Sequence, residues 1–413
     1  MTYYTLLLLF FINLLNYLDR YLVSGALSFI QKDLKLSDGQ AGALMTAFML
    51  VYMVASPLFG WMGDRYTRKY LIAGGILLWS FAATSAHWTV NYLYLMVCRA
   101  LSGIGESSYA TTAPTVIADI VPIESRGKAL AFFYLAIPVG SAFGFMLGGW
   151  ISVHYAWRDA FLVVGIPGVL LTLAILFVRE PQRGQSDGMS VRRSLKWSEM
   201  LVKLWHNPSF VLITFGMALM TFAMGGLAHW MPLFLNRCHG IPQDTASFRF
   251  GALTVVAGLL GTFVGGWLGD WLQKRHRGAY FMICGVSMLV ATPFAIILFT
   301  TSNLSLMWSA VFLAEFCLFL NTGPGNTIIA NVIAPNMRAT AFAVNTFAIH
   351  CLGDAISPAV IGAISDAMAR RGVDTVCSLT YSMYIMPVMM VISGIIFLLG
   401  VSRLAKDTDQ AQQ

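Results

Sequence analysis

Four ionisable residues interrupt long apolar stretches of this chain: Asp19, Arg20, Arg99 and Glu106. Arg99 precedes Glu106 by seven residues, which is nearly two turns, so both side chains project from one face of a helix. We expect Asp19 and Glu106 to take up and release a proton, while Arg99, which keeps its charge, binds an anionic group. The alternative is a static network of buried ions that braces two helices.

Further side chains are candidates for contact with a bound molecule. They are Arg20, Glu315, Asp354, Tyr17 and Tyr109. Arg20 must project away from Asp19, because adjacent residues point in different directions around a helix. His350 lies four residues before Asp354, where a helix brings two side chains together and allows a hydrogen bond. The two tyrosine rings are of a size to line a cavity.

The composition indicates the environment of these charges. Of the 413 residues, 57% are hydrophobic and 11% are charged, whereas roughly a quarter of a soluble domain is charged. The chain is therefore an integral membrane protein, which excludes a cytosolic enzyme, a nucleic-acid-binding domain and a disordered chain. Its six cysteines show neither CxxC nor metal-ligand spacing, so we expect no metal and no other cofactor. The sequence also lacks the HExxH pattern of metal-dependent enzymes.

Twelve stretches are long enough to be membrane spans, since about 20 apolar residues cross the hydrocarbon layer. They cover residues 5–30, 39–63, 70–87, 91–118, 128–152, 158–178, 208–235, 245–269, 279–300, 304–333, 339–365 and 379–403. The predicted fold is an all-α integral membrane protein with twelve transmembrane helices in two pseudo-symmetric six-helix halves, 1–178 and 208–403. A cytoplasmic linker, 179–207, and a cytoplasmic tail, 404–413, complete the predicted organisation.

The distribution of Lys and Arg predicts the orientation. Seventeen of them lie in the connections that face the cytoplasm if the N-terminus is inside, and seven lie in the opposite connections. Because cytoplasmic loops are enriched in these residues, we expect both termini in the cytoplasm of a multi-pass inner (plasma) membrane protein. In the linker, basic residues alternate with Trp197, Leu201, Leu204 and Trp205, which predicts a short amphipathic helix on the inner membrane face.

The two halves repeat one another at an offset of about 210 residues. Gly60-Trp-Met-Gly-Asp64 is echoed by Gly266-Trp-Leu-Gly-Asp270, and a cluster of Lys and Arg follows each. In transporters with parallel repeats the substrate site lies near the membrane midplane, between the halves. Small residues follow one another at four-residue spacing in the fifth stretch, which predicts that this helix packs closely against a neighbour. These residues are Gly140, Gly144 and Gly148.

The repeat and the Gly60–Lys69 signature resemble the major facilitator superfamily. Within it, several stretches resemble the Spinster-like branch: Asn16-Tyr-Leu-Asp-Arg20, Arg99-Ala-Leu-Ser-Gly-Ile-Gly-Glu106, Ala113-Pro-Thr-Val-Ile-Ala-Asp119, Ala136-Ile-Pro-Val-Gly140 and Val178-Arg-Glu-Pro181. Proteins of this branch are implicated in moving lysophospholipids and sphingosine phosphate, and its bacterial members are thought to be proton-driven.

The resemblance also implies an inner gate, which this signature locks when such a carrier faces outward. Its implied members are Asp64, Arg65, Arg68 and Asp119. We expect Asp64 to meet the positive end of the eleventh span near Ala339, and Arg68 to hold Asp64 or Asp119. None of these residues is expected to contact substrate.

We therefore expect a proton-coupled secondary active transporter that works by alternating access on a lysophospholipid-like or other amphiphilic organic anion. The alternative is a proton-coupled transporter of small organic or sugar acids. The spans hold few amide side chains, which favours an amphiphile over a polyol. The repeat and the gate signature argue against a channel or a receptor. The expected partners are the lipid bilayer, the substrate and protons, with no nucleic acid, and the protein is expected to work as a monomer.

Overall fold

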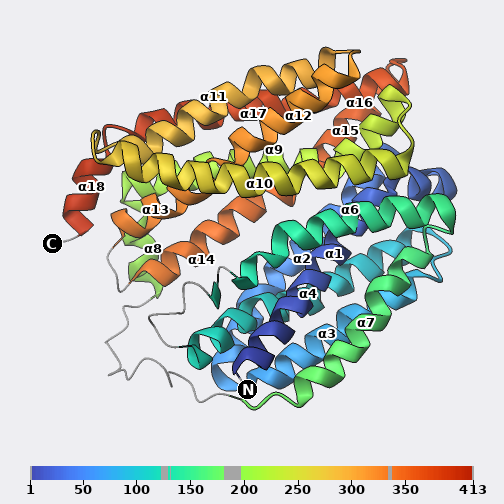
Figure 1. Ribbon diagram of the computed structural model, residues 1–413, viewed down its shortest axis with the longest axis horizontal. Coiled ribbons are helices and arrows are strands. Elements are labelled where there is room, and N and C mark those ends of the chain that lie inside the picture. Colours follow the sequence, from blue (N-terminus) through green and yellow to red (C-terminus); the bar gives the residue numbers. More distant parts are fainter. Residues whose placement is uncertain (1, 122–128, 131, 181–196, 334–336, 412–413) are drawn as a thin grey trace. The chain divides into compact units, whose positions relative to one another are not determined.

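The computed structural model describes residues 2–121, 129–130, 132–180, 197–333 and 337–411, which are largely helical (Figure 1). Within these ranges, ten helical segments are long and apolar enough to cross a membrane. Ten of the twelve expected spans correspond to them. The stretches expected at 70–87 and 91–118 form helices too, but these are less apolar, and the second carries Arg99 and Glu106.

The chain divides into two compact units. Unit 1 contains residues 1–191 together with 228–252. Its helices are α1 (Thr2–Leu34), α2 (Asp38–Arg65), α3 (Arg68–Ala86), α4 (Tyr92–Ile120), α6 (Ala136–His154) and α7 (Asp159–Leu176). Within the unit, α1 packs against α6, α2 against α4, and α3 against both α4 and α7 (Figure 1). This packing brings α1, α2 and α4 together, and these are the helices that carry the charged residues.

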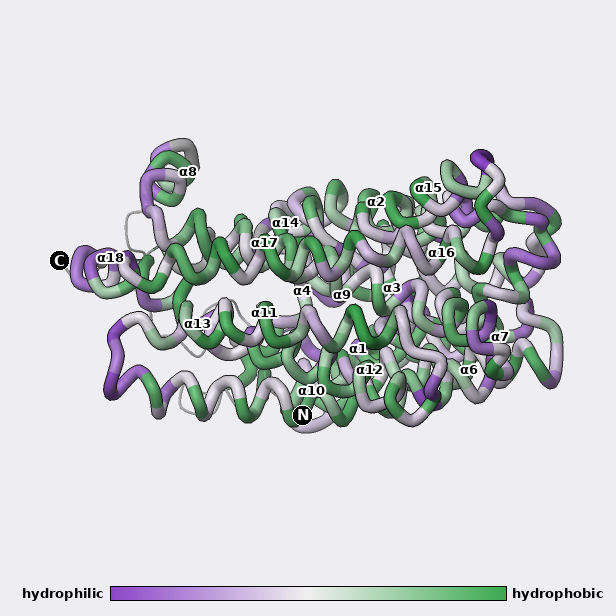
Figure 2. Tube along the Cα trace, turned by 90° about the horizontal axis from the view of Figure 1, so that it is seen from above, coloured by the Kyte–Doolittle hydropathy of each residue, from purple (hydrophilic) through white to green (hydrophobic). Residues whose placement is uncertain are grey.

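Unit 2 contains residues 192–227 and 253–413. Two long helices, α9 (Pro208–His239) and α10 (Gln243–Gln273), begin or end in unit 2 and have their connected ends in unit 1. The remaining helices are α8 (Trp197–Trp205), α11 (Ala279–Thr300), α12 (Leu304–Phe319), α13 (Thr322–Val332), α14 (Arg338–Ile349), η2 (His350–Asp354), α15 (Ser357–Arg370), α16 (Thr375–Met383), α17 (Ile385–Gly400) and α18 (Leu404–Ala411). Figure 2 shows hydrophobic residues along the long helices and hydrophilic residues in α18.

The contact between α1 and α6 depends on glycine. A side chain at Gly140 would place its Cβ atom 2.5 Å from the backbone oxygen of Leu14, and one at Gly144 would lie 2.6 Å from that of Leu18. Such distances leave no room for a methyl group, so the glycines let the two backbones touch. The close packing predicted for this helix is confirmed, and it fixes the segment of α1 that leads into Asp19 and Arg20.

Unit 2 has two local features of note: a widened helical turn at η2, and a buried carboxylate in α18 that caps another helix. At η2 the helix widens by one residue, and Gly353 takes non-helical angles of φ −109° and ψ −108°. At the end of the chain, α18 forms a helix whose buried Asp407 accepts a hydrogen bond from the backbone N–H of Ser209 at 3.0 Å. This carboxylate caps the positive end of α9. The predicted helix in the linker is present as α8, while residues 181–196 of the linker lie outside the described residues.

Candidate functional site

The four ionisable residues of the first half come together as two ion pairs between α1 and α4. Arg99 Nη1 donates to Asp19 Oδ2 at 3.0 Å, and Arg20 Nη2 donates to Glu106 Oε2 at 3.1 Å. Each of the four residues is at most 5% exposed. Arg20 thus points away from Asp19 but toward Glu106, so each carboxylate has its own cation.

The cluster leaves part of its hydrogen-bonding capacity unused. The buried atoms that have no hydrogen-bond partner among the described residues are Asp19 Oδ1, Glu106 Oε1, Arg20 Nε, Arg99 Nε and Arg99 Nη2. Roughly nine in ten buried polar groups of native proteins are hydrogen-bonded, so a group of exceptions at one place needs an explanation. A static brace would be expected to satisfy these atoms. Two free donors on Arg99 and a free oxygen on each carboxylate can instead receive an anion and a proton.

Aromatic rings surround the two cations. Arg20 Cζ lies 4.7 Å from the ring centroid of Tyr17, 5.1 Å from that of Phe48 and 5.0 Å from that of Tyr52. Arg99 Cζ lies 4.6 Å from the centroid of Phe48. Such cation–π contacts stabilise a guanidinium group where water is excluded. Phe48 is fully buried, whereas Tyr17 and Tyr52 are partly exposed.

Tyr109 has different surroundings from Tyr17. Its side chain is fully buried, its hydroxyl donates to the backbone oxygen of Leu9, and its ring makes an edge contact with Trp79. These neighbours belong to a hydrophobic core between α1, α3 and α4. The buried position indicates a role of Tyr109 in packing, and its predicted contact with substrate stays a prediction. Sequence spacing did not distinguish these two tyrosines, because both lie in helices that are apolar on most sides.

The carboxylates of the second half lie in unit 2. Glu315 is 5% exposed, and its Oε1 accepts a hydrogen bond from Thr254 Oγ1 at 3.0 Å. Its other oxygen, Oε2, has no hydrogen-bond partner among the described residues. Asp354 lies at the end of η2, where His350 Nδ1 is 2.9 Å from its Oδ1. The predicted His350–Asp354 pair is confirmed, and its two residues lie at the two ends of η2.

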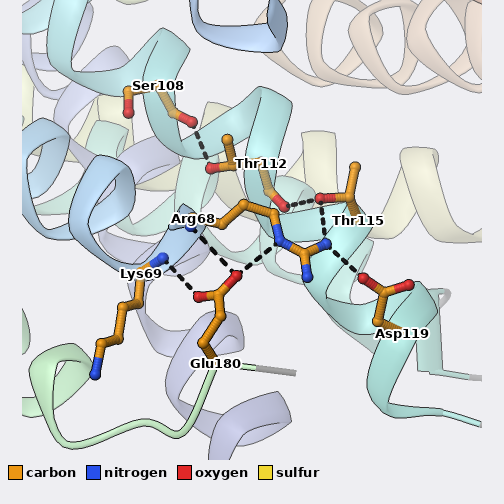
Figure 3. A network of polar contacts seen from close by, with 7 residues as sticks. All are labelled: Arg68, Lys69, Ser108, Thr112, Thr115, Asp119 and Glu180. Atoms are coloured by element: carbon orange, nitrogen blue, oxygen red, sulfur yellow. Dashed lines mark hydrogen bonds and ion pairs between the residues drawn. The ribbon is translucent and has the colours of Figure 1, made fainter. Parts of the chain in front are cut away.

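The gate signature forms a polar network around Arg68, which is 3% exposed (Figure 3). Arg68 Nη1 donates to Asp119 Oδ2 at 2.6 Å, and Arg68 Nε donates to Glu180 Oε1 at 3.0 Å. The Glu180 carboxylate also accepts from the backbone N–H groups of Arg68, at 3.3 Å, and of Lys69, at 3.0 Å. It therefore caps the N-terminus of α3, where the helix dipole favours a negative charge.

Glu180 is the residue of this network that the sequence analysis did not assign. It lies within the Val178-Arg-Glu-Pro181 stretch, so its position was noted without a role. Arg65 lies outside the network, at the surface, with its Cζ 4.1 Å from the ring centroid of Trp61. The side chains of Asp64 and of Ala339, its expected neighbour, lie outside the described residues.

The second copy of the signature has different partners. Asp270 Oδ1 accepts a hydrogen bond from the hydroxyl of Tyr280 at 3.0 Å, and Arg275 stacks over Trp271 with its Cζ 4.3 Å from the centroid. Arg65 makes the same kind of contact with Trp61 in the first copy, although the residue that corresponds to Trp61 is Trp267 and not Trp271. Among the described residues, Asp270 forms no ion pair like those of Arg68 with Asp119 and Glu180, so the charged contacts of the two copies differ.

The chain is similar to a known family and to known proteins over most of its length. A family profile described as the Major Facilitator Superfamily matches residues 9–358. The protein spinster of Drosophila melanogaster is 37% identical over 380 residues, which are 89% of this chain and 63% of that protein. The sphingosine-1-phosphate transporter of Danio rerio is 36% identical over 429 residues, which are 98% of this chain and 85% of that transporter.

Solved structures share the fold. A bacterial homologue of the human lysosomal transporter Spinster, in an inward-facing and unoccupied conformation, has a TM-score of 0.88 at 24% identity, with 98% of each chain covered. A D-xylose–proton symporter has a TM-score of 0.75 at 15% identity and covers 96% of this chain and 97% of its own. At these identities the likeness concerns the fold alone.

Proposed function

The chain belongs to the major facilitator superfamily, in its Spinster-like branch, and from this membership we propose that it is a proton-coupled transporter of an amphiphilic organic anion. It is a multi-pass membrane transporter and not an enzyme. The proposed substrate resembles a lysophospholipid or sphingosine phosphate, the second being the molecule named for the relative from Danio rerio. The proton gradient drives the cycle, and no cofactor takes part.

One observation carries the proposal: in two buried ion pairs, Asp19–Arg99 and Glu106–Arg20, each of the four residues has a buried polar atom without a hydrogen-bond partner in the described part of the chain. An isolated buried charge is costly. A carboxylate whose cation turns to another partner therefore binds a proton more readily. An anionic headgroup that engages Arg99 competes with Asp19 for the same guanidinium. Binding of the substrate anion to Arg99 is thereby coupled to binding of a proton by a carboxylate of the same cluster.

The substrate class follows from the chemistry of Arg99. Its Nε and Nη2 atoms form a fork of two donors, and such a fork matches the oxygens of a phosphate or a carboxylate. An acyl chain needs an apolar wall beside the headgroup site, and α1, α2 and α4 offer mainly apolar residues. The same fork would also suit a small organic or sugar acid, which is the second outcome of the experiment below.

The inner gate and the topology complete the proposal. Arg68, Asp119 and Glu180, together with Asp64 and Arg65, form the cytoplasmic lock of an alternating-access cycle. The helices α3 and α4 cross the membrane in addition to the ten apolar segments, which gives twelve spans with both termini in the cytoplasm. The remaining proposals are the plasma membrane as its location, a monomer as the working form, and substrate contacts for Arg20, Glu315, Asp354 and Tyr17.

The test compares wild type with Asp19→Asn and Glu106→Gln in detergent micelles. Lysophospholipids, sphingosine phosphate and small organic acids are added in turn, and proton release or uptake is followed with a pH indicator. The expected result is a proton signal with the lipids that either substitution abolishes. Glu199→Gln, a change at an exposed glutamate in α8, serves as the control and should retain the signal.

Two results would change the proposal in different ways. A signal with small acids alone would replace the amphiphile by the alternative substrate and leave the proton-coupling carboxylates in place. Undiminished signals in both variants would show that Asp19 and Glu106 are structural. Glu315 and Asp354 would then be the carboxylates to examine.

A further inference from the structure

The two ion pairs of the cluster differ in their aromatic surroundings. Three rings lie within 5.1 Å of Arg20 Cζ, and they come from both α1 and α2, whereas Arg99 has only the Phe48 contact among the described residues. Arg20 also reaches Glu106 through a single nitrogen, Nη2, at 3.1 Å, and its Nε has no hydrogen-bond partner there. Its guanidinium group is thus shared between one carboxylate and three rings.

The packing of α2 against α4 fixes one of these rings. A side chain at Gly103 would place its Cβ atom 2.5 Å from the backbone oxygen of Phe48, so the two helices touch there. Gly103 lies between Arg99 and Glu106 on α4, and Phe48 is therefore held beside both of them. Tyr52 follows one turn later on α2, its ring 6.1 Å from that of Phe48 and inclined to it by 27°.

Protonation of Glu106 would leave the buried charge of Arg20 uncompensated. When Glu106 binds a proton, Arg20 loses its counter-charge while it is only 5% exposed. A buried cation without a partner costs several kcal/mol, which would oppose protonation. Aromatic faces attract a desolvated guanidinium group and release no proton, so they can replace the carboxylate without changing the charge of the site.

We propose that Tyr17, Phe48 and Tyr52 form a standby site for the Arg20 guanidinium, which receives this cation whenever Glu106 is protonated. This inference rests on the proposed proton coupling and adds which carboxylate gives up its partner: Glu106 titrates, and Asp19 stays with Arg99 until an anion arrives. The charged and titratable groups that face Glu106 are Asp19 and Arg20 of α1 and Arg99 of α4. The Tyr52 hydroxyl of α2 faces it too. The three rings are positioning residues and need not touch the substrate.

The experiment removes rings and measures the pH profile of proton-coupled transport in vesicles. Losing rings disfavours the state in which Glu106 is protonated, so more acid is needed to reach it. For Tyr17→Leu/Tyr52→Leu we expect the midpoint of the profile to move to lower pH by about one unit, which corresponds to about tenfold weaker proton binding. For Tyr52→Leu alone we expect about a threefold effect.

Matched variants separate the effect of losing an aromatic ring near Arg20 from other effects of the substitutions. Tyr52→Phe keeps the ring and removes only the hydroxyl, which is hydrogen-bonded to Arg20, so it should move the midpoint less than Tyr52→Leu does. Phe81→Leu removes an exposed ring of α3 and should retain the wild-type midpoint. If the double variant does not fold, Tyr52→Leu, a change at a partly exposed residue, carries the test. A purely structural role would lower the transport rate of the leucine variants at every pH without moving the midpoint.

The outcomes distinguish this inference from the proposed function. If Glu106→Gln abolishes proton coupling but the leucine variants keep the wild-type midpoint, the standby site is wrong and proton coupling stands. If the leucine variants move the midpoint to higher pH, the rings favour the ion pair and the inference is overturned. If Glu106→Gln leaves coupling intact, the proposed function itself fails at this residue.

Discussion

At the scale of single residues, the main finding is that the two arginines are not equivalent. Arg20 and Arg99 each pair with one carboxylate, yet among the described residues Arg99 has two buried nitrogen atoms without a hydrogen-bond partner and Arg20 has one. A fork of two donors binds an oxyanion in two places, whereas a single donor cannot. We therefore expect the anionic headgroup to bind at Arg99 and the proton to bind at Glu106, the partner of Arg20.

This difference predicts the effect of Arg99→Lys. Lysine keeps the charge but replaces the planar fork by a single ammonium group, so at least one charged hydrogen bond to the anion is lost. Such a bond is worth about 1.5–3 kcal/mol, and we expect at least about tenfold weaker binding of an anionic lysolipid. Equilibrium binding of radiolabelled sphingosine phosphate measures it. Arg370→Lys, at the surface of α15, is the control, and equal affinity in both variants would remove Arg99 from the headgroup site.

At the scale of helices, glycine decides how closely α1 and α6 approach. The α1 segment that carries Asp19 and Arg20 is held by contacts of Gly140 and Gly144 with the backbones of Leu14 and Leu18. Because a packed interface between helices does not deform continuously, a shift of α6 would move α1 and change both ion pairs. The small residues of α6 thus contribute to the geometry of the charge cluster without touching it.

This packing predicts opposite effects for two glycine substitutions. Gly144→Ala would place a methyl group 2.6 Å from the Leu18 backbone oxygen, so we expect a loss of about 1–3 kcal/mol in the free energy of unfolding. Gly74→Ala, on α3, has nothing within 4 Å of the new atom and should be neutral or stabilising by up to about 1 kcal/mol. Thermal unfolding in detergent compares them. Equal melting temperatures would contradict the close packing of α1 and α6.

At the scale of the whole molecule, the proposed topology can be tested at two connections of unit 2. His276 and Asn303 are exposed, and they lie at opposite ends of α11. Twelve spans with both termini inside place His276 in the cytoplasm and Asn303 outside. In a cysteine-free background, a membrane-impermeant thiol reagent added to intact cells should label Asn303→Cys and leave His276→Cys unlabelled. The reverse pattern would invert the orientation.

Much of the fold was predictable from the sequence, because membrane spans depend on local composition. A run of about 20 apolar residues is recognisable without knowledge of its neighbours. Ten of the expected spans meet this criterion in the structure. The two helices that do not meet it are α3 and α4, and α4 carries the charges of the site. In α4 the charged residues of the candidate site, Arg99 and Glu106, weaken the hydropathy signal.

The candidate site was only partly predictable. The sequence identified Asp19, Arg99 and Glu106 as costly charges at membrane depth, and it predicted the His350–Asp354 pair from a spacing of four residues. It did not identify Arg20 as the partner of Glu106, because which side of α1 faces α4 is a matter of tertiary packing. Glu180 was missed for a similar reason, since it lies 112 residues from the helix end that it caps.

The sequence alone determined that this protein lies in a membrane, that its two halves repeat, and that four charges lie where charges are costly. These properties depend on composition and spacing, which each segment carries by itself. Only the tertiary structure decided which charge pairs with which, that Tyr17 lies beside Arg20 while Tyr109 fills the core, and that three rings gather around one cation. These properties arise from contacts between helices that are distant along the chain, and such contacts are fixed by packing.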